Sequence, residues 1–135
     1  MNESTLRDFF SGDASLQELV ADLHGAITDD GHGVRRHAIV DMDTEFVVLS
    51  SHLARICDAF LAGSLNHDDL RAIGFCIVAS DNFDYDTDCD DGARVADVAI
   101  DWSTPEINFP IDSDHVAKWK LYLETGADTL RHRDA

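Results

Sequence analysis

Two stretches of the chain carry the same succession of local signals, and this succession restricts the fold more than any other feature. Residues 9–19 read FFSGDASLQEL and residues 60–70 read FLAGSLNHDDL. In each stretch an apolar helical pattern stops at a glycine, a capping residue follows, and a second apolar stripe begins. We interpret both as corners between helices, and a trace of internal duplication is the alternative. Short corners of this kind are typical of antiparallel helical bundles.

The spacing of apolar residues extends this pattern along the chain and predicts about five or six helices. A short first helix covers residues 5–10, and the second begins after Ser15, where Glu18 completes a capping box. Later helices are predicted to begin at Asn66 and at Asp112 or Ser113, with helix ends at Gly12, Gly63 and Gly126. The expected fold class is therefore all-α, a compact antiparallel bundle, with residues 1–128 as a single domain and 129–135 as a frayed tail.

The residues expected to face the core recur at helical spacing. They are Leu16, Leu19, Val20, Leu23 and Ile27; Leu70, Ile73 and Ile77; Val95, Val98, Ala99 and Trp102; and Val116, Trp119 and Leu123. In the helix after Asn66, the residues Phe75, Cys76 and Val78 make much of the remaining surface apolar as well. An apolar surface of this width predicts that this helix is the central and most buried one.

Residues 37–49 carry two conflicting patterns. The runs 38–40 and 46–49 consist of β-prone residues and indicate a hairpin. An uninterrupted helical face, however, passes through Phe46, Leu49, Leu53, Ile56, Cys57 and Phe60. We favour a helix that begins near Asp43 and ends at Gly63, with the hairpin as the alternative.

The chain is strongly acidic, with 27 Asp and Glu residues against 10 Lys and Arg residues and a net charge of −17. This charge excludes unaided binding to nucleic acid or to an anionic membrane surface, because both are polyanions. A basic protein is the partner that such a field favours. The alternative is that the acidity only solubilises the chain or reflects a compositional bias.

The cellular compartment is predicted from signals that the sequence lacks. No stretch approaches the ~20 apolar residues that span a bilayer, and the opening MNESTLRDFF has no basic-then-apolar signal pattern. We therefore expect a cytoplasmic protein. Its three cysteines, Cys57, Cys76 and Cys89, form no metal-type pair and are expected to be free thiols, with Cys57 and Cys76 in the core.

The densest charge lies in the segment DNFDYDTDCDDG, residues 81–92. Its six aspartates repel one another and no Lys or Arg lies among them, so a basic side chain would relieve the repulsion. The residues expected to bind a basic partner are Asp81, Asp84, Tyr85, Asp86, Asp88, Asp90 and Asp91. Their carboxylates can imitate a row of phosphates. Tyr85 would act as an aromatic anchor, and Phe83 either does the same or packs in the core.

Metal binding and catalysis find less support. An EF-hand loop counted from Asp86 has acids at positions 1, 3 and 5, but it has Asp91 where glycine is required and Asp97 in place of the final glutamate. The seven histidines are scattered, and the HExxH, G-x-S-x-G and CxxC motifs and a phosphate-binding glycine loop are absent. We therefore expect no metal, no cofactor and no catalytic activity.

The order of these motifs resembles that of a known group. A short helix ending in FFSGDASLQEL, a helical hairpin and a helix running into ASDNFDYD are similar to the bacterial self-protective colicin-like immunity proteins, including the colicin D type. The matching parts, residues 6–27 and 79–86, cover less than a third of the chain. The resemblance implies a small acidic helical bundle that binds a basic, tRNA-cleaving toxin domain and blocks its active site by imitating the charge of RNA.

The resemblance also implies a role for individual residues. It places Asp81, Asp84 and Asp86 at the contact with the toxin domain. The alternative function is an acidic mimic of nucleic acid, or an adaptor, that binds another basic protein with no toxin involved. Neither function requires direct contact with nucleic acid or with a membrane.

Overall fold

The computed structural model describes residues 2–25, 27–29, 35–37, 42, 44–105 and 109–127. These residues form six helices, α1 (Glu3–Ser11), α2 (Leu16–Gly25), α3 (Ser50–Leu61), α4 (His67–Ala79), α5 (Asp90–Ser103) and α6 (Ser113–Thr125). They also form four short strands, β1 (Ile27–Asp29), β2 (Arg35–His37), β3 (Phe46–Val47) and β4 (Phe83–Asp84). Strands β1 and β2 pair antiparallel, and β3 and β4 pair parallel. The prediction of an all-α bundle is confirmed, with two small strand pairs added to it.

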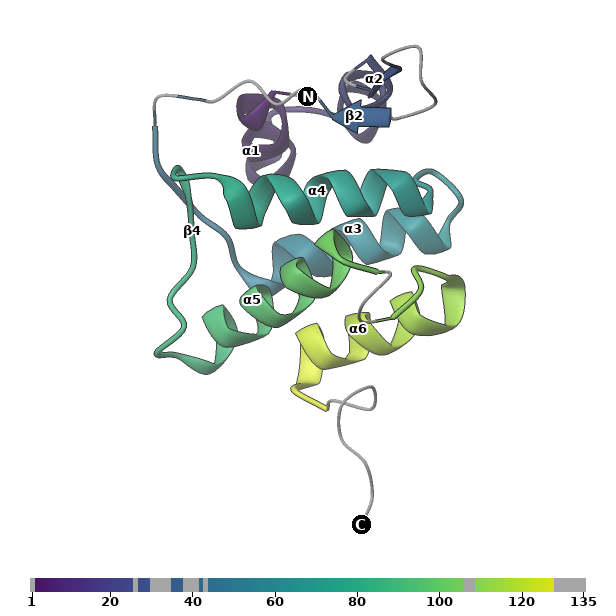
Figure 1. Ribbon diagram of the computed structural model, residues 1–135. Helices are drawn as coiled ribbons and strands as arrows, with labels where there is room; N and C mark the ends of the chain where they lie inside the picture. Colours follow the sequence, from purple (N-terminus) through teal and green to yellow (C-terminus); the bar gives the residue numbers. More distant parts are fainter. Residues whose placement is uncertain are drawn as a thin grey trace.

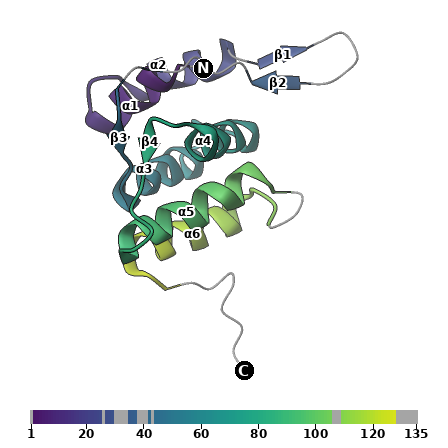
Figure 2. The same ribbon diagram turned by 60° about the vertical axis from the view of Figure 1, so that its left-hand side comes forward.

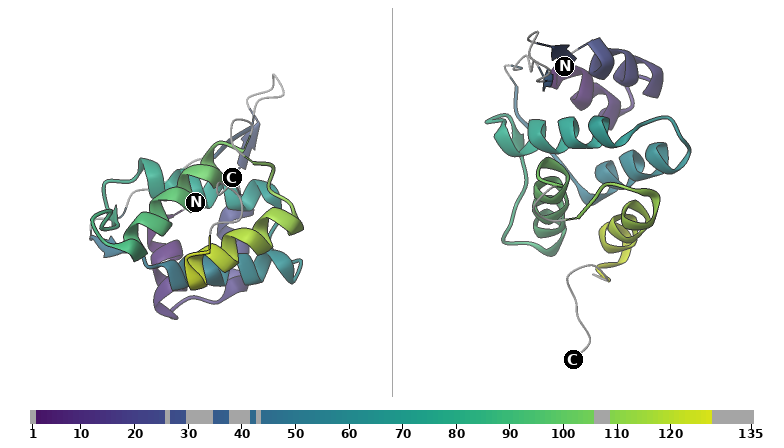
Figure 3. Two further views of the ribbon diagram at one scale, coloured as in Figure 1. Left: turned by 90° about the horizontal axis from the view of Figure 1, so that it is seen from below. Right: turned by 45° about the vertical axis from the view of Figure 1, so that its right-hand side comes forward.

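The helices stack in three layers of two. Helices α1 and α2 form one outer layer, α3 and α4 the middle layer, and α5 and α6 the other outer layer (Figures 1 and 2). Across the layers α4 packs mainly on α5, and α3 packs mainly on α6; both stacked pairs are also visible from another side in Figure 3. Helix α4 further contacts α2 and α3, which confirms its predicted central position.

Local capping signals fix the helix ends as predicted. The Ser15 hydroxyl accepts the Glu18 N–H at 3.1 Å, the Asn66 amide oxygen accepts the Asp69 N–H at 2.9 Å, and the Asp112 carboxylate accepts the His115 N–H at 2.9 Å. These bonds satisfy N–H groups that have no partner inside the first helical turn. The predicted stops at Gly12, Gly63 and Gly126 all have positive φ, between 81° and 87°. Helix boundaries were predictable here because each cap lies within a few residues of its helix.

The core is built around two tryptophans, one from α5 and one from α6. The rings of Trp102 and Trp119 are fully buried and meet edge to face, with centroids 6.3 Å apart. The indole N–H of Trp119 donates to the buried carboxylate of Asp101 at 3.0 Å, so both polar groups are partnered inside the core. Burial is confirmed for Leu19, Leu23, Leu70, Ile73, Ile77, Val95, Val98, Ala99, Trp102, Val116, Trp119 and Leu123, whereas Leu16 and Val20 are partly buried.

Helices α4 and α5 approach each other closely at Gly74. A Cβ atom at this position would lie 2.6 Å from the Trp102 Cβ and 2.7 Å from the Ala99 carbonyl oxygen. Neither atom is the end of a flexible side chain, so any side chain at position 74 forces the two helices apart. Glycine is otherwise unfavourable inside a helix. Its presence here is explained by the distance between the helices.

The prediction of a helix that begins near Asp43 and ends at Gly63 is wrong in its first half. Phe46 and Val47 form β3, Leu49 is extended with φ −108° and ψ 158°, and α3 begins only at Ser50. The reason is long-range: β3 pairs with β4, and the Phe46 ring packs against Phe83 with centroids 6.3 Å apart. The alternative hairpin does not form at β3 either, because the partner of β3 is β4. Residues 38–41, the other half of the predicted hairpin, lie outside the described residues.

Two smaller predictions need correction, and a third concerns residues outside the described ranges. Helix α2 ends at Gly25, and Ile27 belongs to β1, where it pairs with His37. Phe75 and Val78 are 49% and 40% exposed, because the two-helix middle layer leaves one side of α4 uncovered. The predicted frayed tail, residues 129–135, lies outside the described residues.

We expect the substitution Gly74→Ala to lower the free energy of unfolding by about 1–3 kcal/mol, the usual cost of overpacking a core. Urea unfolding followed by circular dichroism measures it. The higher helix propensity of alanine would by itself have the opposite effect and raise the free energy of unfolding by roughly 0.5–1 kcal/mol. A stabilised variant would therefore show that α4 and α5 are not held at this distance.

Candidate protein-binding surface

The acidic segment predicted to bind a partner joins α4 to α5. It begins with a turn in which the Ser80 hydroxyl accepts the N–H groups of Asn82 at 2.9 Å and Phe83 at 3.3 Å. Strand β4 follows and lies beside β3 in the register Phe46 to Phe83 and Val47 to Asp84 (Figure 2). Two parts of the chain that are distant in sequence thus form one surface. We call residues 81–91 the acidic loop.

An aromatic cluster anchors the acidic loop to the core. The Phe83 ring is 4% exposed and meets Phe10 and Phe46 edge to face, with centroids 6.5 Å and 6.3 Å apart. His52 completes the cluster, its ring stacked 5.0 Å from that of Phe10. Of the two roles considered for Phe83, the structure therefore shows core packing. Tyr85 is partly buried and packs against the core, so only part of its ring is open to a partner.

A tight turn gives the centre of the loop its shape. The Asp86 carbonyl oxygen accepts the Cys89 N–H at 3.2 Å and the Cys89 thiol at 3.1 Å, and the Asp86 carboxylate accepts the Asp88 N–H at 3.0 Å. This turn folds back over the first turn of α5. A Cβ on Gly92 would lie only 1.8 Å from the Asp86 carbonyl oxygen. The glycine is required because backbone occupies the space that a side chain would need.

Five of the six predicted carboxylates point into solvent, and the sixth does not. Asp81, Asp84, Asp86, Asp88 and Asp90 are exposed. Asp91 is partly buried, and its carboxylate accepts both the backbone N–H of Ser50, at 3.1 Å, and the Ser50 hydroxyl. It therefore satisfies an N–H group in the first turn of α3. Asp91 has a structural partner inside the chain, whereas the other five carboxylates remain accessible.

Two cations of the last two helices, Arg94 in α5 and Lys120 in α6, make contacts outside the acidic loop. The Arg94 guanidinium lies against Gly126, 2.7 Å from the point that a Cβ would occupy there, and Lys120 pairs with Asp58 at 2.8 Å. Among the described side chains, no Lys, Arg or His forms an ion pair with any of the six aspartates of the loop. The side chains of Arg35 and Arg36 lie outside the described part. No described cation therefore relieves the repulsion between these carboxylates through a direct ion pair.

His52 connects the aromatic cluster to the start of α3. Its Nδ1 accepts the N–H of Leu49 at 2.9 Å, so this nitrogen is unprotonated in the bond. Burial lowers the pKa of His52, the positive charge of Arg55 lowers it further, and the negative charge of Asp91 partly opposes both. His52 is a structural acceptor at the start of α3.

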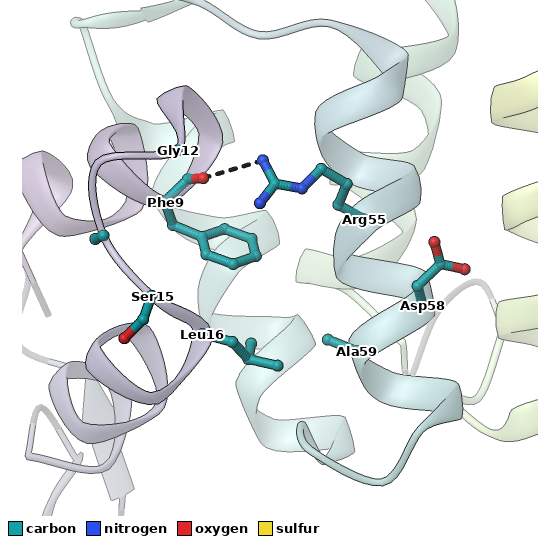
Figure 4. Close-up of a pocket in the computed structure, with 8 residues that line it drawn as sticks. Phe9, Gly12, Ser15, Leu16, Arg55, Asp58 and Ala59 are labelled. Carbon is teal, nitrogen blue, oxygen red and sulfur yellow. Dashed lines mark hydrogen bonds between the residues drawn. The ribbon is translucent and has the colours of Figure 1, made fainter.

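A cavity of about 450 Å³ lies between the corner that joins α1 to α2 and the outer face of α3. The Arg55 guanidinium lies over the Phe9 ring at 4.6 Å and donates to the Phe9 carbonyl oxygen at 3.1 Å (Figure 4). It also donates to the carbonyl oxygen of Phe10 at 3.2 Å. The Ser15 hydroxyl, which also lines the cavity, accepts from Glu18 and caps α2. Of the polar groups that line this cavity, Arg55 joins α3 to α1, and Ser15 caps α2.

The three cysteines have different environments. Cys57 and Cys76 are buried, as predicted, and burial raises the pKa of the Cys57 thiol well above its ordinary value. Cys89 is exposed and is the capping residue of α5, where its sulfur accepts the Gly92 N–H at 3.4 Å. Among the described residues no three His, Cys, Asp or Glu side chains are grouped so that they could hold a metal ion.

Comparisons with known proteins identify no relative: no family model, no curated protein and no solved structure matches this sequence. The resemblance to the colicin-like immunity proteins therefore stays a hypothesis that rests on the quoted motifs. None of the described helices has the length and apolar character that crossing a bilayer requires.

We expect Gly92→Ala to displace the turn at Asp86, because the new methyl group and the Asp86 carbonyl oxygen cannot occupy the same space. Amide hydrogen exchange, measured by NMR, should become faster at Cys89, whose N–H bonds to that oxygen. The substitution Asp90→Ala, at an exposed neighbouring position, is the control and should leave the Cys89 exchange rate unchanged. Unaltered protection of Cys89 in Gly92→Ala would contradict the described turn.

We expect the His52 ring to titrate below the value of about 6.5 that is usual for histidine. The folded state then binds this proton less readily than the unfolded state, so its contribution to stability is complete above the unfolded pKa. This contribution is lost as the pH falls toward the folded pKa. NMR titration of the ring protons in the folded protein and in urea measures both values. In His52→Gln this part of the pH dependence should disappear, and equal pKa values in the two states would exclude the described environment.

Proposed function

We propose that this protein is an inhibitor of the immunity type, which binds a basic bacterial nuclease toxin domain and blocks its active site by imitating the charge of nucleic acid. The proposal places the acidic loop in the toxin's active site and assigns no catalytic step to this chain. It also places the protein in the cytoplasm, where such a domain would meet its RNA substrate.

One observation supports the proposal above the others. Five exposed carboxylates lie on a loop of fixed shape, and no described Lys, Arg or His pairs with them. In the free protein this arrangement costs repulsion. Arg and Lys side chains of a nuclease that normally hold phosphates would relieve that repulsion through charge-assisted hydrogen bonds.

The shape of the loop supports the same partner. A surface that only solubilises the protein needs no defined conformation, but the acidic loop is held at four points: by Ser80, by the pairing of β4 with β3, by the Phe83 ring and by the turn over Gly92. Fixing the carboxylates before binding reduces the ordering cost of association. A fixed row of charges also distinguishes one basic surface from another.

The experiment uses the double variant Asp84→Lys/Asp88→Lys. The Asp86 carboxylate closes the turn by accepting the Asp88 N–H, whereas the Asp84 carboxylate accepts only the N–H of the adjacent Tyr85, at 2.9 Å. The double variant therefore removes one local bond and should leave the turn in place. The probe is the basic domain encoded by the gene next to this one. The unaltered protein should bind that domain, inhibit its cleavage of tRNA, and allow cells that produce it to grow. The double variant should bind it about tenfold or more weakly, because like charges now face each other.

A matched control separates the loop from overall charge. The variant Asp13→Lys/Asp114→Lys changes the net charge by the same amount at exposed positions in the corner before α2 and the first turn of α6. It should protect cells as the unaltered protein does. If both variants lose affinity equally, general attraction explains the binding. If the neighbouring domain is neither bound nor inhibited, the immunity function is excluded.

A further inference from the structure

Within the part of the chain that the structure describes, strand β3 has a partner on only one side. The N–H groups of Phe46 and Val48 donate to the carbonyl oxygens of Asn82 and Asp84, both at 2.8 Å, and these bonds hold β3 to β4. Along a strand, successive residues direct their N–H and C=O groups to opposite edges. The N–H and C=O groups of Val47, between the two donors, therefore point away from β4, and those of Glu45 point the same way.

These outward groups have no partner in the described part of the chain. No hydrogen bond reaches the backbone N–H or C=O of Glu45 or Val47 from any described residue. Val47 is also 56% exposed, the highest value among the large apolar residues of the described chain. An edge strand with unpaired backbone groups and an exposed apolar side chain is a template for a further strand.

The side chains around this edge alternate in character. Phe46 and Val48 turn inward, while Glu45, Val47 and Leu49 are exposed on the outer face, and Asp84 stands beside Val47 on β4. An added strand would meet an apolar side chain flanked by carboxylates. Such a surface matches an extended segment in which basic and apolar residues alternate. The edge is short, because the N–H and C=O of Leu49 already bond to His52.

We propose that the outer edge of β3, residues 45–48, binds an extended, basic segment of the partner protein as an additional strand. This inference rests on the proposed function for the identity of the partner. It adds a mode of recognition in which backbone hydrogen bonds give affinity, while Val47 and the flanking carboxylates select alternating apolar and basic side chains. The acidic loop adjoins this edge strand, because β4 is part of the loop and pairs with the opposite edge of β3.

The test uses the intact protein and a synthetic probe, an acetylated and amidated heptapeptide of alternating lysine and valine. NMR spectra of the ¹⁵N-labelled protein should show binding, and exchange of the Val47 amide proton should slow when the peptide is present. Two analogues carry N-methyl groups, one on the lysine nitrogens and one on the valine nitrogens. Only one set of nitrogens faces the edge of β3, so one analogue should bind about tenfold more weakly and the other should bind normally.

A protein variant gives the complementary measurement. Val47→Pro removes the outward N–H and places a ring at the edge, and proline is tolerated on edge strands where the N–H is unused. It should weaken peptide binding about tenfold, whereas Val47→Thr, which keeps the N–H, should change it little. Should Val47→Pro fail to fold, the pair of methylated peptides still decides the question, because they leave the protein unaltered.

The outcomes separate this inference from the proposed function. Equal binding of heptalysine and of both methylated analogues would show attraction by charge alone and would overturn strand addition. The same holds if Val47→Pro binds the alternating peptide as tightly as the unaltered protein does. Loss of toxin inhibition in Asp84→Lys/Asp88→Lys together with full inhibition in Val47→Pro would support the proposed function and reject the edge. If only one methylated analogue loses binding and the protein inhibits no toxin, the result would support strand addition at β3 and reject the proposed function.

Discussion

The close contact between α4 and α5 at Gly74 determines where the acidic loop can lie. The loop starts at the end of α4 and finishes at the beginning of α5, so the crossing of these helices fixes the distance that it spans. The same crossing holds Trp102 against Trp119 and joins the middle layer to the layer of α6. A side chain at position 74 would change the packing of the core and the path of the loop together.

The acidic loop separates residues that hold its shape from residues that carry its charge. Phe83, Ser80 and Gly92 act through burial, a hydrogen-bonded turn and the absence of a side chain. Most of the carboxylates face solvent, where water screens their mutual repulsion. Asp91 is the exception, because it bonds to Ser50 and so ties the start of α5 to the start of α3. The electrostatic cost of the charge is thus kept away from the core.

Sequence patterns predicted the parts of the structure that depend on neighbouring residues. Ser15, Asn66 and Asp112 were recognised as caps because a cap and its helix are adjacent, and the apolar stripe of α5 follows from its own spacing. The strand at Phe46 was missed because it depends on pairing with Phe83, far along the chain. Its apolar residues also fit a helical face, and only the distant partner decides between the two conformations.

The candidate surface was predicted to a similar extent. The charge of the acidic loop is visible in the sequence, but the bond from Ser50 to Asp91 and the unpaired edge of β3 appear only in three dimensions. Gly92 carried a local signal, since a glycine early in a helix after a run of turn-forming residues is unusual. Its reason, the carbonyl oxygen of Asp86, lies in the turn packed against it.

Different residues hold the shape of the acidic loop and carry its charge, and this affects how the sequence of such a protein can diversify. Among the described residues, no other helix or strand is held in place by the side chains of Asp81, Asp84, Asp88 and Asp90, so the scaffold tolerates many residues at these four positions. Related chains can therefore exchange one set of recognised surfaces for another without rebuilding the interior. The binding specificity of the loop can thus change while the stability of the helical core is preserved.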